Sequence, residues 1–247
     1  MAARLNKRKA GALLDQARLL IANGTPSRAV EVLGPVLDAN VLPGAVVAAV
    51  YAEALELAGR RDDARAFLEE EVVRHKTDTT LMVRLGVLLV HANQSARGVE
   101  LMARARNELR RDPAFLTNYA AGLLKVGRLA DAESTLAAAM LTGGGEDTRL
   151  VLALAKAQRG DAQGAEAIAV QIGTQSKDAN LRSAARAIEA DCRLMQGDPR
   201  GALQRFRALD AEGSLDPEHL PHAALAAQLA GDEAQSSAFM QRRMSTA

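Results

Sequence analysis

Small and apolar residues recur along this chain at a nearly constant distance, and the pattern is clearest in the segment 123–136, LLKVGRLADAESTL. Apolar residues spaced three and four positions apart predict a helix on each side of Gly127. Gly is typical of a tight turn after a helix, because it adopts positive φ without steric cost. The segment therefore predicts the end of one helix, a turn and the start of a second helix.

The same turn recurs along almost the whole chain. In each copy a Gly or Asn is followed five residues later by a small residue, and successive turns are spaced by 33 to 37 residues. A period in this range predicts an array of repeated helix pairs. The seven turns are Gly24/Ala29, Gly59/Ala64, Asn93/Gly98, Gly127/Ala132, Gly160/Ala165, Gly197/Ala202 and Gly231/Ser236.

Two further columns of residues keep the same phase. Twelve residues before each small residue stands another small residue, which lets the two helices of a pair approach closely. Four residues after it stands an apolar residue, which fits the buried stripe of the second helix. The first column is Ala17, Ala52, Gly86, Ala120, Ala153, Ala190 and Ala224, and the second is Leu33, Leu68, Met102, Leu136, Ala169, Phe206 and Met240.

This arrangement resembles the tetratricopeptide repeat family. The period, the small residue of the first helix and the turn Gly with its following Ala carry the resemblance, most closely in QRGDAQGA (158–165) and MQGDPRGA (195–202). In the second of these, Asp198 before Pro199 also predicts a capped helix start. The resemblance covers about residues 10–247 and implies an all-α fold, a right-handed α-solenoid of about seven repeats whose first helices line a concave groove.

Departures from the family pattern divide the chain into three parts. The large aromatic residues of the first helix are replaced by apolar residues in most of units one to four, but by charged residues in units five and six. A Gly run, 143–145, lies between units four and five. We therefore expect a basic segment at 1–9, regular repeats at 10–142 and less regular repeats with a C-terminal cap at 146–247. The charged residues are Arg149, Lys156, Arg186, Glu189 and Arg193.

Composition narrows the function. Lys and Arg (31) nearly balance Asp and Glu (30), and aromatic residues are 2%, so neither the charge nor the stacking surface expected of a nucleic-acid binder is present. Arg4, Lys7, Arg8 and Lys9 give a basic start, which suits either an acidic partner or membrane surface, or a simply solvated terminus. No apolar stretch approaches the roughly 20 residues of a membrane span, and no signal peptide is evident. We expect a cytoplasmic, bacterial protein that meets a membrane only indirectly, through a partner.

The resemblance places the candidate binding site in the groove of units three to five. An apolar groove with a few polar groups suits an amphipathic helix or an extended peptide of another protein. The alternative for each apolar position is that it belongs to the core between repeats. The predicted groove residues are Arg84, Val87, Val90, His91, Asn118, Ala121, Leu124, Lys125, Leu150 and Leu154.

The sequence offers no complete motif for metal binding, phosphate binding or catalysis. His219 and His222 have metal-ligand spacing, but Pro221 lies between them and no Cys or third His is near in sequence, so we expect no metal. The Gly run lacks the Lys-Ser/Thr ending of a phosphate-binding loop, and Cys192 stands alone. We expect no cofactor and no catalysis. The function predicted is a protein-binding adaptor or scaffold, and the alternative is a self-assembling protein that forms homo-oligomers through the ends or faces of its solenoid.

The expected loss of regularity after residue 142 is testable by hydrogen–deuterium exchange. Looser packing gives more frequent local opening, so amides of 146–247 should exchange faster than those of 10–142. Equal protection of the two parts would count against this division of the chain.

Overall fold

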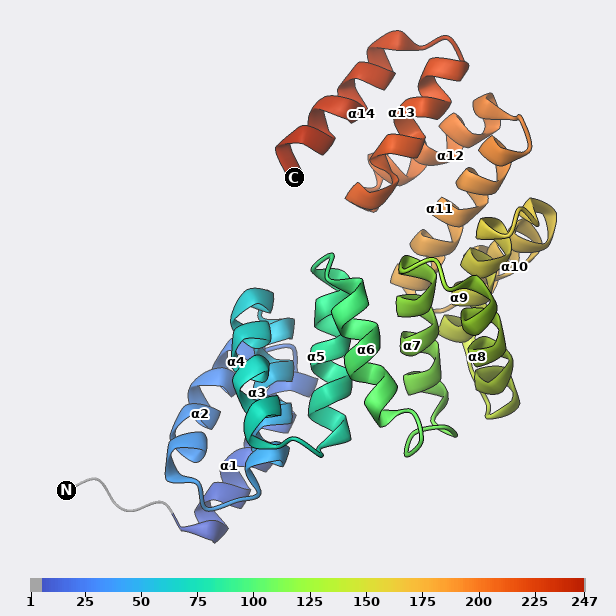
Figure 1. Cartoon of the computed structure of the whole chain (residues 1–247). Helices are drawn as coiled ribbons and strands as arrows, with labels where there is room; N and C mark the ends of the chain where they lie inside the picture. The colour runs from blue at the N-terminus through green and yellow to red at the C-terminus, as the bar shows by residue number, and fades with distance from the viewer. Residues whose placement is uncertain (1–5, 247) are drawn as a thin grey trace. The chain divides into compact units, whose positions relative to one another are not determined.

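The structure is a computed structural model that describes residues 6–246. Residues 1–5, which include the predicted basic Arg4, lie outside the described part. The fold consists of helix pairs without strands in the described residues, so the predicted all-α repeat fold is confirmed (Figure 1). The pairs are α1 (Lys7–Ala22) with α2 (Pro26–Ala39), α3 (Gly44–Leu57) with α4 (Arg61–Arg74), α5 (Thr79–His91) with α6 (Ser95–Ala105), α7 (Pro113–Lys125) with α8 (Leu129–Leu141), α9 (Glu146–Gln158) with α10 (Ala162–Gln175), α11 (Ala179–Met195) with α12 (Pro199–Ala211), and α13 (Leu220–Leu229) with α14 (Glu233–Thr246).

The chain divides into two compact units, Met1–Arg110 and Arg111–Ala247. The first unit holds α1–α6. The second holds α7–α14 and a short 3-10 turn, η1 (Pro217–His219). The boundary expected at the Gly run therefore lies inside the second unit, and the expected difference in regularity stays a prediction. No helix of the described residues is long and apolar enough to cross a membrane.

The residues at the turn positions adopt the backbone conformation that the sequence predicts. Gly127 has φ 74°, and Asn93, the one turn position without Gly, also adopts the left-handed region with φ 58°. Asn tolerates this region better than other side chains do. Local chemistry also starts the helices: the Asp198 carboxylate accepts a hydrogen bond from the Gly201 N–H at 2.9 Å, with Pro199 in the first turn of α12. These short-range signals fix where each helix begins and ends.

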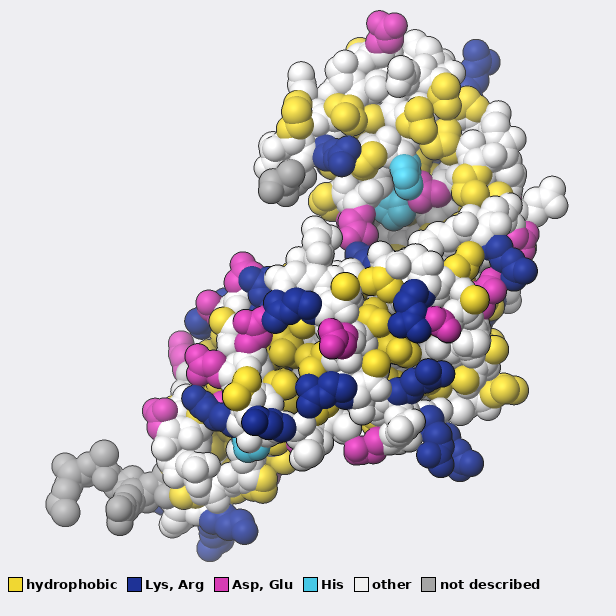
Figure 2. Space-filling model, viewed as in Figure 1, with side chains coloured by type: hydrophobic (Ala, Val, Ile, Leu, Met, Phe, Trp, Pro, Cys, Tyr) yellow, Lys and Arg dark blue, Asp and Glu magenta, His cyan; other side chains and the backbone are white. Residues whose placement is uncertain are grey.

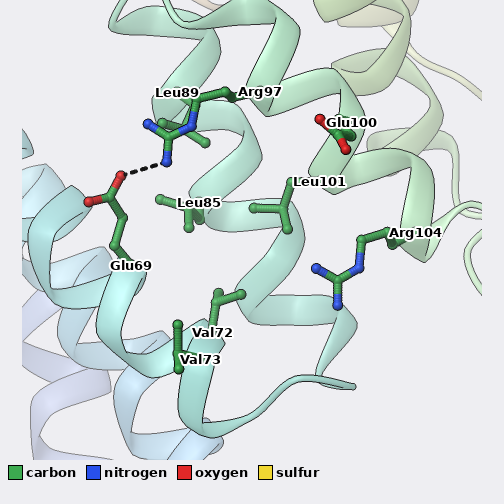
Figure 3. Close-up of a pocket in the computed structure, with 9 residues that line it drawn as sticks. All are labelled: Glu69, Val72, Val73, Leu85, Leu89, Arg97, Glu100, Leu101 and Arg104. Carbon is green, nitrogen blue, oxygen red and sulfur yellow. Dashed lines mark hydrogen bonds and ion pairs between the residues drawn. The ribbon is translucent and has the colours of Figure 1, made fainter.

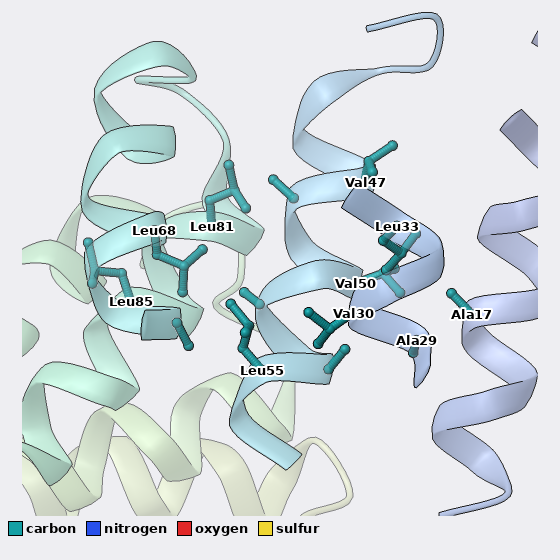
Figure 4. Packing of buried hydrophobic residues seen from close by; sticks show 14 of the residues in the cluster. Ala17, Ala29, Val30, Leu33, Val47, Val50, Leu55, Leu68, Leu81 and Leu85 are labelled. Atoms are coloured by element: carbon teal, nitrogen blue, oxygen red, sulfur yellow. The ribbon is translucent and has the colours of Figure 1, made fainter. Parts of the chain in front are cut away.

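Close approach of paired helices is the main packing device. In the first unit, Ala17 of α1 faces Ala29 of α2, and both are fully buried (Figure 4). In the third pair the contact is tighter still, because a Cβ placed on Gly98 would lie 2.5 Å from the carbonyl oxygen of Gly86 and 2.9 Å from Val90 Cγ2. The backbones of α5 and α6 therefore touch. Small residues at these positions are required by geometry as well as favoured by pattern.

The predicted apolar stripe of the second helices is buried with one exception. Leu33, Leu136 and Phe206 are fully buried, as are their counterparts in the other pairs up to α12. In α14, however, Met240 is 40% exposed, and Phe239 is the residue that enters the core. No described helix follows α14, so nothing packs over the face that carries Met240. The prediction that Met240 lies in the buried stripe was wrong.

Three of the charged residues at packing positions of units five and six, Arg186, Glu189 and Arg193, form ion pairs. Glu189 is 5% exposed, and its carboxylate lies 3.2 Å from the Arg193 guanidinium and 2.9 Å from that of Arg205. Arg186 pairs with Glu212 through two contacts, at 2.7 and 3.0 Å. A buried charge is tolerated when opposite charges and hydrogen bonds surround it. Ion pairs thus take over part of the role that large apolar side chains have in the first units.

The Gly86–Gly98 contact gives a stability prediction. We expect Gly98→Ala to lower the free energy of unfolding by about 1–3 kcal/mol, because the new methyl group overlaps the backbone of α5. The matched control is Gly11→Ala in α1, where an added Cβ meets nothing within 4 Å. That change should stabilise by up to about 1 kcal/mol through helix propensity. Urea unfolding measures both, and a stabilised Gly98→Ala variant would contradict the close approach.

Candidate binding surfaces

The predicted groove residues of the first unit lie on α5 but do not form one surface. Val90 is only 5% exposed and packs against Gly98, so it belongs to the core of its own pair. Val87 is half-buried, and His91 is exposed at the end of the helix. His91 lines a hollow of about 240 Å³ together with Arg61, Asp62 and Arg65 at the start of α4, and with Leu88 and Ala92. For Val90, the alternative reading as core is the one that the structure favours.

Arg84, the other predicted polar group on α5, is engaged within the chain. Its guanidinium donates to Glu56 at 3.1 Å and to Glu53 at 3.2 Å, both on the neighbouring first helix α3. Burial raises the pKa of the Glu56 carboxyl above its ordinary value, although the Arg84 charge and hydrogen bond act in the opposite direction. These contacts link two first helices side by side. A partner that used Arg84 would have to compete with both carboxylates.

In the second unit the predicted residues of α7 separate into exposed and buried positions. Asn118 is exposed, Ala121 is half-buried, and Leu124 is 6% exposed. Lys125 is exposed along part of its length, and its ammonium lies 2.8 Å from the Glu218 carboxylate in η1. Leu124 is therefore a core residue in this structure, as its alternative reading proposed. A substitution of Leu124 would lower the stability of the fold, so its effect on binding could not be measured separately.

A hollow of about 350 Å³ lies between α7 and α9, the first helices of two successive pairs. It brings Asn118 of α7 together with Leu150 of α9, two of the predicted groove residues, whereas Leu154 is half-buried elsewhere along α9. At its base the hydroxyls of Thr117 and Thr148 share a buried hydrogen bond of 2.7 Å. The remaining lining residues are Pro113, Ala114, Gly145, Asp147 and Val151. The hollow thus combines apolar walls with the exposed amide of Asn118 and the exposed carboxylate of Asp147.

The Gly run helps to shape this hollow. A Cβ on Gly144 would lie 2.5 Å from Thr148 Oγ1 and 2.9 Å from the Ala139 carbonyl oxygen. The Gly144 N–H also donates to that carbonyl at 2.8 Å. The loop is therefore packed closely against α8 and α9 at Gly144. This close packing holds Gly145 and Thr148 at the wall of the hollow.

A second apolar hollow, of about 420 Å³, lies in the first unit over α5, between the second helices α4 and α6 (Figure 3). Leu85 and Leu89 form its floor, and Val73 at its edge is 65% exposed. In the space-filling view, hydrophobic side chains over α4 to α6 are interspersed with charged ones (Figure 2). Its other lining residues are Val72 and Leu101, with Glu69, Arg97, Glu100 and Arg104 at the rim.

Sequence reasoning missed the hollow between α4 and α6, because it lies on second helices. One signal was available. Leu89 stands at a position where the resembled family has a large aromatic residue. A leucine fills less volume than a ring, and an interior that is otherwise close-packed then leaves a hollow. The rim is held in part by Arg97, whose guanidinium lies 3.3 Å from the Glu69 carboxylate.

A third cluster joins Asp191 of α11 to two histidines near the start of α13. His222 Nδ1 lies 2.8 Å from Asp191 Oδ1, and His219 Nδ1 lies 3.0 Å from Asp191 Oδ2. Although burial alone raises the pKa of the Asp191 carboxyl, its contacts with the two imidazoles outweigh that effect and hold this pKa below its ordinary value. The hydrogen bond to Asp191 raises the pKa of His222. The two histidines were noted from their spacing, but Asp191, 28 residues before His219, was not.

Cys192 follows Asp191 in sequence but faces another part of the core. It is fully buried in an apolar cluster with Ala153, Ala165 and Ile188. Burial raises the pKa of its thiol to about 11. A thiol that stays protonated and enclosed is a packing group.

Comparison with solved structures identifies the architecture. A tetratricopeptide repeat protein from Parabacteroides merdae aligns with a TM-score of 0.72 and 12% identity, covering 96% of this chain and 92% of that one. A thermophilic tetratricopeptide repeat protein of Thermus thermophilus aligns with a TM-score of 0.59 and 17% identity, covering 72% and 98%. YrrB, described as a repeat protein of this kind with an unusual peptide-binding site, aligns with a TM-score of 0.53 and 18% identity, covering 81% and 92%. No family model and no curated protein matches the sequence.

Proposed function

Starting from the tetratricopeptide-repeat fold that these similarities show, we propose that the chain is a non-catalytic scaffold that binds a segment of another protein. The hollow between α7 and α9 carries this proposal, because it is apolar, open and formed by first helices of successive pairs. The partner segment is an extended peptide or an amphipathic helix. The proposed site of action is the cytoplasm, and any membrane contact is made by the partner.

The dimensions and chemistry of the hollow suit one anchoring side chain. Its volume is at the small end of the range of ligand pockets, about 300–1,000 Å³. Leu150 and Val151 offer apolar surface to a side chain, and the exposed Asn118 amide offers two donors and one acceptor. These are the groups that a peptide backbone needs on either side of an anchor residue. Thr117 and Thr148 satisfy one another, so an apolar group above them leaves neither hydroxyl unpaired.

The solved structures support a peptide ligand by analogy only. The description of YrrB mentions a peptide-binding site, which concerns that protein. For this chain, the same fold places the first helices of successive pairs beside one another, and the hollow lies between two of them. Val87 and His91 of α5 extend the proposal to the corresponding helix of the first unit, where they remain accessible.

Capture of the partner from a lysate of the source organism tests the proposal. Asn118→Arg places a long charged side chain at the mouth of the hollow, on an exposed position that should not affect folding. We expect at least about tenfold weaker capture, because one anchor contact and one hydrogen bond together exceed about 1.4 kcal/mol. The matched control is Ala137→Arg, which adds the same charge at an exposed position of the second helix α8. Equal capture by Asn118→Arg and Ala137→Arg would rule out this site.

A second candidate function is self-assembly through the hollow between α4 and α6. The observation that favours it is Val73, which is 65% exposed at the edge of an apolar floor of about 420 Å³. Apolar surface of this kind is common at protein–protein contacts. Arg97, Arg104, Glu69 and Glu100 give the rim both signs of charge, which suits a symmetric contact between two copies.

Sedimentation velocity over a range of concentrations tests this second function. Self-assembly predicts a concentration-dependent larger species in the native protein, and its loss in Val73→Arg. The control is Leu141→Arg, because Leu141 is 89% exposed and lies in the other unit. A single monomeric species at every concentration would exclude self-assembly and leave the partner-binding proposal unaffected.

A further inference from the structure

Asp191, His219 and His222 come from three different elements, α11, η1 and the first turn of α13. Each offers one ligand atom, and these atoms all lie within 4.8 Å of one another. Histidine and acidic side chains gather in the same place over α11 and α13 in the space-filling view (Figure 2). The cluster lies within the second unit and takes no part in the binding surfaces proposed above.

His219 carries the second observation. Its Nδ1 is buried and has no hydrogen-bond partner, although it lies 3.0 Å from Asp191 Oδ2. The nitrogen and the carboxylate oxygen are therefore in ion-pair contact, but they are poorly aligned for a hydrogen bond. The ring itself is confined, since it packs at 6.5 Å from the Phe206 ring and 6.3 Å from the His222 ring, between centroids. A metal ion completes this kind of arrangement, in which a buried and orientated imidazole nitrogen lies next to a carboxylate.

We infer that Asp191, His219 and His222 bind one divalent transition-metal ion, with Zn²⁺ as the ion that fits the donors best. Two imidazole nitrogens and one carboxylate oxygen match zinc, which binds these ligands at about 2.0–2.2 Å. Calcium and magnesium prefer sets of oxygen ligands, so they fit this cluster poorly. Atoms that lie within 4.8 Å of one another reach a common ion through small side-chain rotations. Three protein ligands leave a fourth position for water.

The position of the site gives it a structural role. Asp191 belongs to the sixth helix pair, whereas His219 and His222 precede and begin the seventh. An ion held by all three therefore links the last pair to the one before it. The alternative state of the cluster is an ion pair, in which a protonated His222 faces Asp191 at 2.8 Å without any metal. The metal-bound state and the ion-paired state connect the same helices, but only the metal-bound state depends on added metal and is lost with chelators.

Zinc titration of the full chain, prepared without a histidine tag, tests the inference. We expect one Zn²⁺ per chain by calorimetry, a rise in Tm on addition of Zn²⁺, and reversal by EDTA, because an ion that binds the folded state alone stabilises it. Co²⁺ in place of Zn²⁺ should give the visible absorption of a site with nitrogen and oxygen ligands. His222→Gln, at a side chain that is 54% exposed, should weaken binding at least about tenfold, since even the loss of an outer-shell partner costs 10–100-fold.

Two comparisons between variants distinguish zinc binding at this site from adventitious zinc binding elsewhere on the chain. Asp191→Asn should weaken zinc binding as His222→Gln does, whereas His91→Gln, on α5 in the other unit, should leave the stoichiometry and affinity unchanged. Circular dichroism verifies that each variant is folded. Failure of the folded native chain to bind Zn²⁺ or Co²⁺, or unchanged affinity in both His222→Gln and Asp191→Asn, would overturn the inference and would not affect the proposed scaffold function.

Discussion

The close approach of the two helices in each pair is the constraint on which the rest of this structure depends. Where α5 meets α6, backbone lies against backbone, and no side chain larger than a hydrogen fits at Gly98. In the other pairs up to α12, alanines such as Ala17 and Ala29 occupy the same place and are fully buried. Helices this close need little volume to fill the space between them, which explains how a chain with only 2% aromatic residues forms continuous cores. Leucine and alanine suffice within a pair.

The small volume of these side chains also leaves hollows on the surface of the fold. Over α5, leucines stand where larger rings would close the gap between neighbouring helix pairs. The hollow over Leu85 and Leu89 arises in this way, and a second hollow lies between α7 and α9. In the second unit, ion pairs around Glu189 and Arg186 connect helices that apolar packing connects elsewhere. Packing inside the pairs is thus strict, while the contacts between pairs leave room for a ligand.

Local features of the fold could be predicted from the sequence, and those that depend on tertiary placement could not. Gly127, Asn93 and Asp198 act within a few residues of themselves, so their roles followed from pattern. Which face of a helix a side chain occupies depends on its exact position, because a shift of one residue rotates the side chain by about 100° around the helix axis. A shift of this size is enough to move Val90 and Leu124 from the expected groove into the core. The meeting of Asp191 with two histidines from the next helix pair left no local trace in the sequence, and the hollow between α4 and α6 left only the leucine at position 89.

Site-specific photo-cross-linking in source cells is the most direct test of the claim that the first helices of this repeat fold hold a partner protein. A photoreactive residue replaces Asn118 at the hollow between α7 and α9, Val73 at the hollow between α4 and α6, or Ala137 on α8 as a control. The account predicts one discrete protein adduct from position 118 and none from position 137. Adducts from position 73 alone, or equal background at all three positions, would contradict it.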